Sequence, residues 1–336
     1  ALNAIEKEKQ ISKDIILEAI ENSLLAACKN QFGKSENIRV NIDRETGEVK
    51  VFADYEVVED DMIEDDALQI GITEAKLRFR DDVGVGEKVS TEVTPKNFGR
   101  IAAQKAKQVV VQKIREEERK VLYVQYLEKE REVITGIVQR YSGKNVCINL
   151  GRVDAILMES EQVRGEHFRP TEHIKLYVVE VKDTPKGPRI TVSRSHPEFV
   201  KRLFEEEVTE IQDGIVTIES IAREAGSRTK IAVSTVDPNV DAVGACVGMN
   251  GSRVNAIVNE LRGEKIDIVN WSDMPEIFIE NALSPAMVMD VSIDEYEKTA
   301  RVIVPENQLS LAIGKEGQNA RLAAKLTGYK IDIKCE

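Results

Sequence analysis

The sequence predicts a multidomain α+β protein, in which an α+β domain with a long helix precedes a small β-barrel and two copies of an α/β unit. Three observations carry this prediction. Apolar residues recur at helical spacing over residues 97–126, and the apolar period becomes two from Val133 onward. One pattern of helix, glycine loop, helix and strand then occurs twice. At 336 residues the chain has room for roughly two to four domains.

The first domain, residues 1–130, is expected to combine helices with a hairpin. An amphipathic helix comes first, and two alternating segments, residues 38–42 and 49–58, follow with turn-forming residues between them. The acidic stretch at 59–66 is expected to be a solvated loop. The long helix over residues 97–126 ends the domain and predicts a rigid connector.

Residues 131–197 form the second predicted domain. Its short alternating segments are separated by turns that contain glycine and proline. The five predicted strands are residues 133–140, 145–150, 154–157, 174–181 and 190–194. Five short strands in so few residues predict a small closed barrel of the OB type.

Residues 198–274 and 275–336 are predicted to be two copies of one unit. Their GxxG loops begin at Gly248 and Gly314, 66 residues apart, and a Lys-Ile-Asp-Ile strand follows each loop at nearly the same distance. Each copy has the order strand, strand, helix, GxxG, helix, strand. One GxxG in a chain with 20 glycines is expected by chance, whereas two in the same structural context are a specific signal.

The GxxG loops predict a clamp for a phosphodiester backbone. Glycine has no Cβ, so a backbone phosphate can approach closely, and the helix that starts after the loop points free N–H groups at it. This arrangement is typical of KH modules, which clamp about four nucleotides of a single strand. The candidate RNA-binding residues are Gly248, Met249, Asn250, Gly251, Ser252, Arg253, Gly314, Lys315, Glu316, Gly317, Gln318, Asn319, Arg321 and Lys325.

The two loops differ in charge. The second contains Lys315, whereas the first contains the neutral Met249 and Asn250, and its nearest cation is Arg253. The first loop is therefore expected to depend more on backbone donors. Arg321 and Lys325 share one helix face, where RNA contact and simple solvation are both open.

The barrel offers a second candidate surface, because OB folds bind single strands through aromatic rings and basic grooves. The candidate contacts are Arg140, His167, Phe168 and Arg169. Core packing explains Phe168 equally well, so both interpretations stay open.

Charge and cysteine content restrict the partners and the compartment. The net charge is −12, so any RNA contact depends on locally placed donors; residues 131–197, with 11 basic and 8 acidic side chains, carry +3. The four cysteines are scattered without metal-ligand spacing, so we expect no metal site. So few cysteines in a long chain also argue against disulfides. No apolar run of about 20 residues and no signal peptide are recognisable, which predicts a cytoplasmic protein without membrane contact.

The order of barrel and two KH modules resembles the NusA family of bacterial transcription factors. Four segments carry the resemblance: residues 99–104 (GRIAAQ), 263–271 (GEKIDIVNW), 282–286 (ALSPA) and 309–323 (LSLAIGKEGQNARLA). The sequence ends after the second KH module, as in family members without acidic C-terminal repeats.

The resemblance implies an S1 domain of OB fold followed by two KH domains of type II. It implies that residues 1–130 bind RNA polymerase and that the protein acts on nascent single-stranded RNA with other Nus factors. Pausing, termination and antitermination would be the processes it modulates. It would be monomeric when free and would need no cofactor.

Two other classes of function are weighed against this one. An enzyme would need a catalytic site, but Gly84-Val85-Gly86-Glu87-Lys88 has the wrong spacing for a phosphate loop, and the three histidines have no nucleophile pattern beside them. A phosphorolytic exoribonuclease also combines these modules, but in the reverse order and after catalytic domains. An interaction scaffold that has lost RNA binding is the third class, favoured by the acidic balance of residues 198–336.

Overall fold

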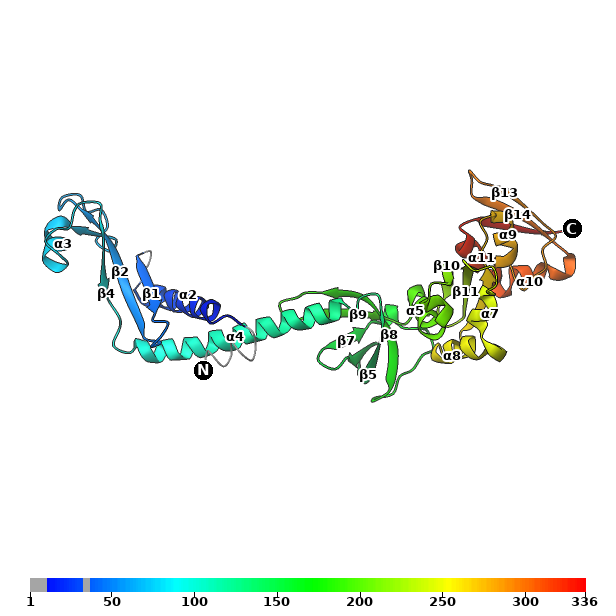
Figure 1. Ribbon diagram of the computed structural model, residues 1–336, viewed down its shortest axis with the longest axis horizontal. Helices are drawn as coiled ribbons and strands as arrows, with labels where there is room; N and C mark the ends of the chain where they lie inside the picture. Colours follow the sequence, from blue (N-terminus) through cyan, green and yellow to red (C-terminus); the bar gives the residue numbers. More distant parts are fainter. Residues whose placement is uncertain (1–10, 33–36) are drawn as a thin grey trace. The chain divides into compact units, whose positions relative to one another are not determined.

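The computed structural model describes residues 11–32 and 37–336. It divides into two compact units, one ending at Val121 and the other beginning at Leu122 (Figure 1). Within the described part of the chain, no helix has the length and apolar character needed to cross a membrane.

The first unit is a four-stranded sheet with helices. β1 (Ile38–Ile42) pairs antiparallel with β2 (Val49–Val58), and β2 also pairs with β3 (Gln69–Gly71) and β4 (Lys88–Glu92). The helices are α2 (Lys13–Phe32), α3 (Ile72–Arg78) and the first part of α4 (Phe98–Leu127). The predicted hairpin and the acidic loop after β2 are both confirmed.

Two apolar clusters hold this unit together. The larger lies between α2, the β1–β2 hairpin and the start of α4, with Ile16, Leu24, Val51 and Phe98 almost fully buried. A smaller one lies under α3. Because apolar burial is the main stabilising term in such small sheets, α2 and α4 are integral to the fold.

Helix α4 has 30 residues and, at 1.5 Å per residue, is about 45 Å long. The prediction of a long helix at residues 97–126 is therefore confirmed within one residue at each end. Its last turn belongs to the second unit, where Tyr126 is buried in the barrel core and donates its hydroxyl hydrogen to the carbonyl oxygen of Leu150 at 2.8 Å.

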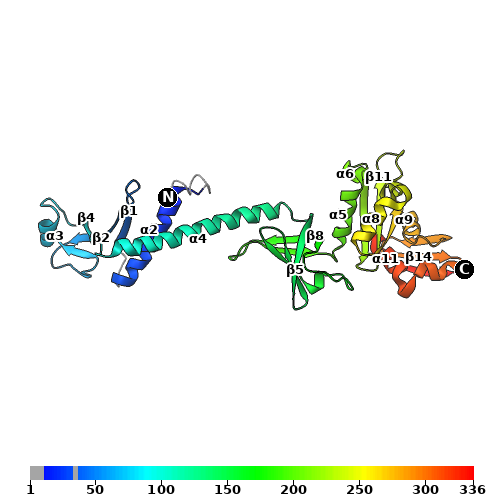
Figure 2. The same cartoon turned by 90° about the horizontal axis from the view of Figure 1, so that it is seen from below.

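Five strands close into a barrel in the order β5–β6–β7–β9–β8. Two of them, β5 and β8, are labelled in Figure 2. The strands are β5 (Val133–Ser142), β6 (Asn145–Asn149), β7 (Asp154–Leu157), β8 (His173–Lys182) and β9 (Arg189–Ser193). A Cβ at Gly136 would come within 2.3 Å of the Ile148 side chain, so the barrel interior leaves no room for a larger residue there. The predicted barrel of the OB type is confirmed.

The two α/β copies have one topology. The first, called the first KH unit below, contains α5 (Pro197–Glu207), α6 (Thr209–Gln212), β10 (Val216–Glu224), β11 (Arg228–Thr235), α7 (Ala242–Val247), α8 (Ser252–Glu260) and β12 (Lys265–Asn270). The second KH unit contains α9 (Pro275–Ala282), β13 (Asp290–Asp294), β14 (Thr299–Val304), α10 (Leu309–Ile313), α11 (Gln318–Thr327) and β15 (Lys330–Cys335). In each sheet the first two strands are antiparallel and the third is parallel to the second.

The two KH units are packed on each other through one apolar cluster. Ala222 and Ala232 of the first unit and Ile279 and Leu283 of the second are all buried in it. Lys230, fully buried at this joint, donates to the carbonyl oxygen of Ser284 at 2.8 Å and pairs with Asp267 at 3.0 Å. Burial lowers the pKa of Lys230, and the nearby carboxylate opposes that shift.

Candidate nucleic-acid interface

The first loop, residues 248–251, connects α7 to α8 through unusual backbone angles. Gly248 has φ 75° and ψ 173°, Asn250 has φ 52°, and Gly251 at the start of α8 has φ 76°. Positive φ values favour glycine and, among other residues, asparagine. The sequence Gly-Met-Asn-Gly therefore suits this turn locally.

The second loop, residues 314–317, repeats these angles almost degree for degree. Gly314 has φ 77° and ψ 170°, Glu316 has φ 54°, and Gly317 has φ 74°. Two loops 66 residues apart thus present the same backbone shape, as the matched sequence pattern predicts.

The first glycine of each loop is also required by space. A Cβ on Gly248 would lie 3.0 Å from the backbone nitrogen of Arg253, and one on Gly314 would lie 2.7 Å from that of Asn319. Any side chain would push against the following helix. The chain therefore turns tightly between the two helices. The first N–H groups of α8 and α11, those of Ser252 and Gln318, donate to the carbonyl oxygens of Met249 and Lys315 within the loops.

The tips of both loops are exposed. Met249 is 84% exposed, and Asn250, Ser252, Lys315 and Glu316 are exposed as well. Helix N-termini carry partial positive charge, which favours a phosphate at this position. The second loop has a positive side chain, Lys315, next to the negative Glu316, whereas the first loop has no charged side chain; whether the two loops differ in RNA binding stays a prediction.

Arg253 is engaged inside the protein. Its guanidinium donates to the Glu210 carboxylate at 2.7 Å and to the Ala245 carbonyl oxygen at 2.6 Å. These bonds connect α8 to α6 and α7, so Arg253 stabilises the two helices on either side of the first loop.

Gln318 and Asn319 also have partners within the protein. Asn319 is buried and donates to the carbonyl oxygens of Leu283 and Ala312, both at 3.0 Å. Gln318 donates to the Glu224 carboxylate at 2.9 Å. Asn319 therefore fixes the second loop within its own unit, and Gln318 connects the start of α11 to the first KH unit.

Arg321 lies at the same joint, while Lys325 is exposed. Arg321 donates to the Glu224 carboxylate at 2.5 Å and to the carbonyl oxygen of Glu316, within the second loop, at 3.0 Å. The hydrogen bond from Arg321 lowers the pKa of Glu224 below its ordinary value, although partial burial opposes the shift. The predicted shared face of Arg321 and Lys325 thus includes one residue engaged at the joint and one open to solvent.

Replacing Glu224 by glutamine should destabilise the joint in a pH-dependent way. Because the folded-state pKa of Glu224 is lowered, its charge stabilises the fold above its ordinary pKa, and this contribution is lost as the pH falls through the lowered value. Arg321 is partly exposed, so we expect a loss below about 1 kcal/mol at pH 7 and a smaller one near pH 3. Thermal melts of Glu224→Gln and the parent at both pH values measure this, and a loss equal at both would contradict it.

Each KH unit also has a half-buried apolar strip beside its loop. In the first unit it includes Ile266 and Ile268 of β12 next to α7, and in the second Ile331 and Ile333 of β15 next to α10. Bases splayed from a clamped strand need apolar surface of this kind.

The barrel residues predicted from the sequence divide into two groups. Arg140 is exposed on β5. Phe168 is only 4% exposed, and the guanidinium groups of Arg194 and Arg262 lie 5.7 and 4.7 Å from its ring centre. This ring contributes to the core, one of the two interpretations left open by the sequence.

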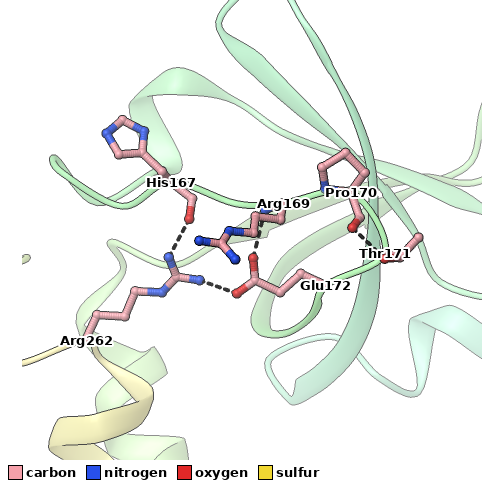
Figure 3. Close-up of a pocket in the computed structure, with 6 residues that line it drawn as sticks. All are labelled: His167, Arg169, Pro170, Thr171, Glu172 and Arg262. Carbon is pink, nitrogen blue, oxygen red and sulfur yellow. Dashed lines mark hydrogen bonds and ion pairs between the residues drawn. The ribbon is translucent and has the colours of Figure 1, made fainter.

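His167 and Arg169 lie together at the edge of a hollow of about 540 Å³ (Figure 3). Arg262, in the turn that follows helix α8 of the first KH unit, lines the same hollow, and so do Pro170, Thr171 and Glu172. The backbone N–H of Arg169 donates to the Glu172 carboxylate at 2.8 Å. The side chain of Arg169 makes no hydrogen bond within the described part of the chain.

A second barrel surface was missed by sequence reasoning. A hollow of about 380 Å³ lies along the seam where β7 and β9 are joined through the single pair Ile156 and Thr191. Half-exposed Ile156 lines it together with two exposed cations, Lys186 and Arg189. The sequence predicts a closed barrel and the proline- and glycine-rich turn before β9, but it does not specify that β9 pairs with β7 to close the barrel.

Comparison with known proteins gives matches over most of the chain. Residues 1–120 match the model of the NusA N-terminal domain, residues 194–271 that of the NusA-like first KH domain, and residues 275–336 that of the NusA-like second KH domain.

Curated relatives match the whole chain. The transcription termination/antitermination protein NusA of Bacillus subtilis (strain 168) is 56% identical over 336 residues, which are 100% of this chain and 90% of that protein. The protein of the same name from Halalkalibacterium halodurans is 54% identical over 100% of this chain and 87% of its own length. The solution structure of the N-terminal domain of NusA from B. subtilis is 52% identical, covers 35% of this chain and 93% of that one, and has a TM-score of 0.32.

Proposed function

Because the chain belongs to the NusA family of transcription termination/antitermination proteins, we propose that it binds RNA polymerase and nascent single-stranded RNA and thereby modulates pausing, termination and antitermination. The observation that carries the RNA part is the pair of loops with matched backbone angles and exposed tips, each at the start of a helix. The proposal assigns no reaction to the chain.

The loops and the strips beside them form the main RNA surface in this proposal. Phosphates would lie against the tips at Met249, Asn250 and Lys315 and the N–H groups of the following helices. The first loop would act through backbone donors and the second through Lys315 as well. Arg253, Gln318, Asn319 and Arg321 support the loops through the hydrogen bonds described above.

The barrel seam would form a second RNA surface. Ile156 offers apolar area to a base, and Lys186 and Arg189 lie where they can pair with phosphates of an extended strand. OB barrels bind oligonucleotides on their second and third strands and on the loop between the fourth and fifth, which here are β6, β7 and the turn before β9.

The net charge of −12 sets a limit on affinity. Without a cationic field, binding from free solution is expected to be modest. Attachment to RNA polymerase would place the transcript near the loops at high local concentration and make binding effectively intramolecular.

We assign polymerase binding to residues 1–130, RNA contact to the barrel at 131–197 and the two KH units at 198–274 and 275–336, and cooperation with other Nus factors to the assembled complex. The basis for the first assignment is the match of residues 1–120 to the family's N-terminal domain. The free protein would be monomeric. It would be located in the cytoplasm, because nascent transcripts are made in that compartment.

Removal of the first unit should abolish recovery of RNA polymerase and leave RNA binding in place. The deletion should end at Val121, since Tyr126 belongs to the barrel core and a longer deletion would damage the barrel. Pull-down of purified bacterial RNA polymerase by the parent and by the shortened chain measures the first expectation, and titration of single-stranded RNA measures the second. Undiminished polymerase recovery would refute the assignment.

A further inference from the structure

Helix α8 of the first KH unit makes different contacts at its two ends. Its N-terminus follows Gly251 and carries the first loop. At its C-terminus, Arg194 from the end of the barrel donates to the backbone carbonyl oxygen of Glu260 at 2.9 Å and to its carboxylate at 3.1 Å. A cation here also suits the negative end of the helix dipole.

Arg194 is a buried contact. It is 1% exposed and donates to both carboxylate oxygens of Glu166, at 2.8 and 2.7 Å, and to the carbonyl oxygen of Lys175 at 2.7 Å. Charged hydrogen bonds of this number and geometry fix the end of α8 at one point on the barrel.

Arg262 makes a second contact between the same two bodies (Figure 3). It donates to the carbonyl oxygen of His167 at 2.6 Å and to the Glu172 carboxylate at 2.7 Å, and its guanidinium lies over the ring of Phe168. All three partners belong to one barrel segment, and the arginine side chain remains 33% exposed.

The backbone of Arg262 has a conformation that does not suit its side chain. Its φ is +56°, a value that is unfavourable for a non-glycine residue. Arg194, which is buried, and Arg262, which is partly exposed, thus connect the C-terminal end of α8 to the barrel at two separate points.

We propose that Arg262 is a positioning residue that locks helix α8, and with it the first loop, at a fixed place relative to the barrel, so that one RNA strand can occupy the barrel and the loop together. The inference that one RNA strand occupies both surfaces rests on the proposed function. The inference that Arg262 fixes the position of α8 relative to the barrel is independent of it.

The alternative use of the hollow in Figure 3 is a phosphate site formed by Arg169 and Arg262. The Glu172 carboxylate disfavours it, because this carboxylate faces the hollow and accepts hydrogen bonds from Arg262 and from the Arg169 backbone. A phosphate would have to displace a negative charge that already has partners.

The test compares Arg262→Gly with Arg169→Ala. Glycine removes the side chain and suits the positive φ, so the fold should be retained, which a thermal melt checks. Arg169→Ala removes the same charge from the same hollow without breaking a side-chain hydrogen bond. Spin labels at Arg152→Cys on the barrel and Asn259→Cys on α8, with Cys147 and Cys335 replaced by serine, report the distance by pulsed electron paramagnetic resonance.

We expect Arg262→Gly to broaden the distance distribution and Arg169→Ala to leave it unchanged. The affinity for an RNA of about 16 nucleotides should fall about 3- to 10-fold in Arg262→Gly, while that for one of about five nucleotides stays constant. An unchanged distribution in a folded Arg262→Gly variant would overturn the proposal, as would a loss of long-RNA affinity in Arg169→Ala alone. If the parent bound neither RNA, the proposed function would fail while the distance comparison would still decide the positional part.

Discussion

The affinity for single-stranded RNA should fall about 100-fold when both loop tips are changed to aspartate. The substitutions are Met249→Asp and Asn250→Asp in the first loop and Lys315→Asp and Glu316→Asp in the second. Each loop changes by two negative charges at the place where a phosphate would lie, and roughly tenfold per loop corresponds to about 1.4 kcal/mol. Titration of a fluorescent RNA at two salt concentrations measures the loss. The salt dependence should also weaken, because fewer phosphates are neutralised.

The fold should survive these changes. Asn250 and Glu316 have positive φ values of 52° and 54°, which aspartate tolerates, and all four side chains are exposed. Equal melting temperatures would verify this.

Two further variants each change one loop, Met249→Asp with Asn250→Asp in the first and Lys315→Asp with Glu316→Asp in the second. Both lower the net charge by two, so the difference between their RNA affinities isolates the role of Lys315. We expect the larger loss at the second loop, where a cationic donor disappears as well. Unchanged affinity in the folded four-residue variant would exclude the loops as clamps. A weak baseline that no loop variant alters would favour the interaction scaffold.

The loops could be predicted because their information is local. Two glycines at fixed spacing, a helix on either side and a repeated strand specify the turn without any distant partner, and the backbone angles of Gly248 and Gly314 agree with that prediction. The same holds for the barrel strands and the long helix, whose apolar periods of two and 3.6 are visible in short segments.

The roles of the surrounding side chains could not be predicted, because their partners are distant in sequence. Arg321 bonds with Glu224, 97 positions away, and Arg253 bonds with Glu210, 43 positions away. Helical spacing shows which residues share a face but not which carboxylate a tertiary contact brings to it. Phe168 illustrates the same limit, since two arginines from other segments cover its ring.

Breaking the buried pair of Arg223 and Glu264 should have the largest effect on stability. Their side chains are 1% and 0% exposed and are joined by two hydrogen bonds of 2.9 Å. Glu264 also accepts from Thr229 and from the backbone N–H of Gly226. Arg223 donates in turn to the carbonyl oxygens of Arg194 and His196 in the linker between barrel and KH unit.

Replacing Arg223 by methionine leaves the Glu264 carboxylate buried without its countercharge. We expect a loss of about 3–5 kcal/mol, because removing one member of a buried pair leaves an uncompensated charge. Trp271, the single tryptophan, follows β12 directly, so its fluorescence during urea unfolding reports on the KH unit concerned.

The double variant Arg223→Met with Glu264→Gln separates the charge effect from lost packing. Once both charges are absent, the cost of an unpaired buried ion disappears, so the double variant should lose less stability than the sum of the two single variants. Additive losses would mean that the two side chains act independently and that hydrogen bonds to the linker carbonyls, rather than the ion pair, stabilise this region. The linker to which Arg223 donates also contains Arg194. The double variant should therefore also loosen α8 from the barrel and broaden the distribution of distances between spin labels on the two.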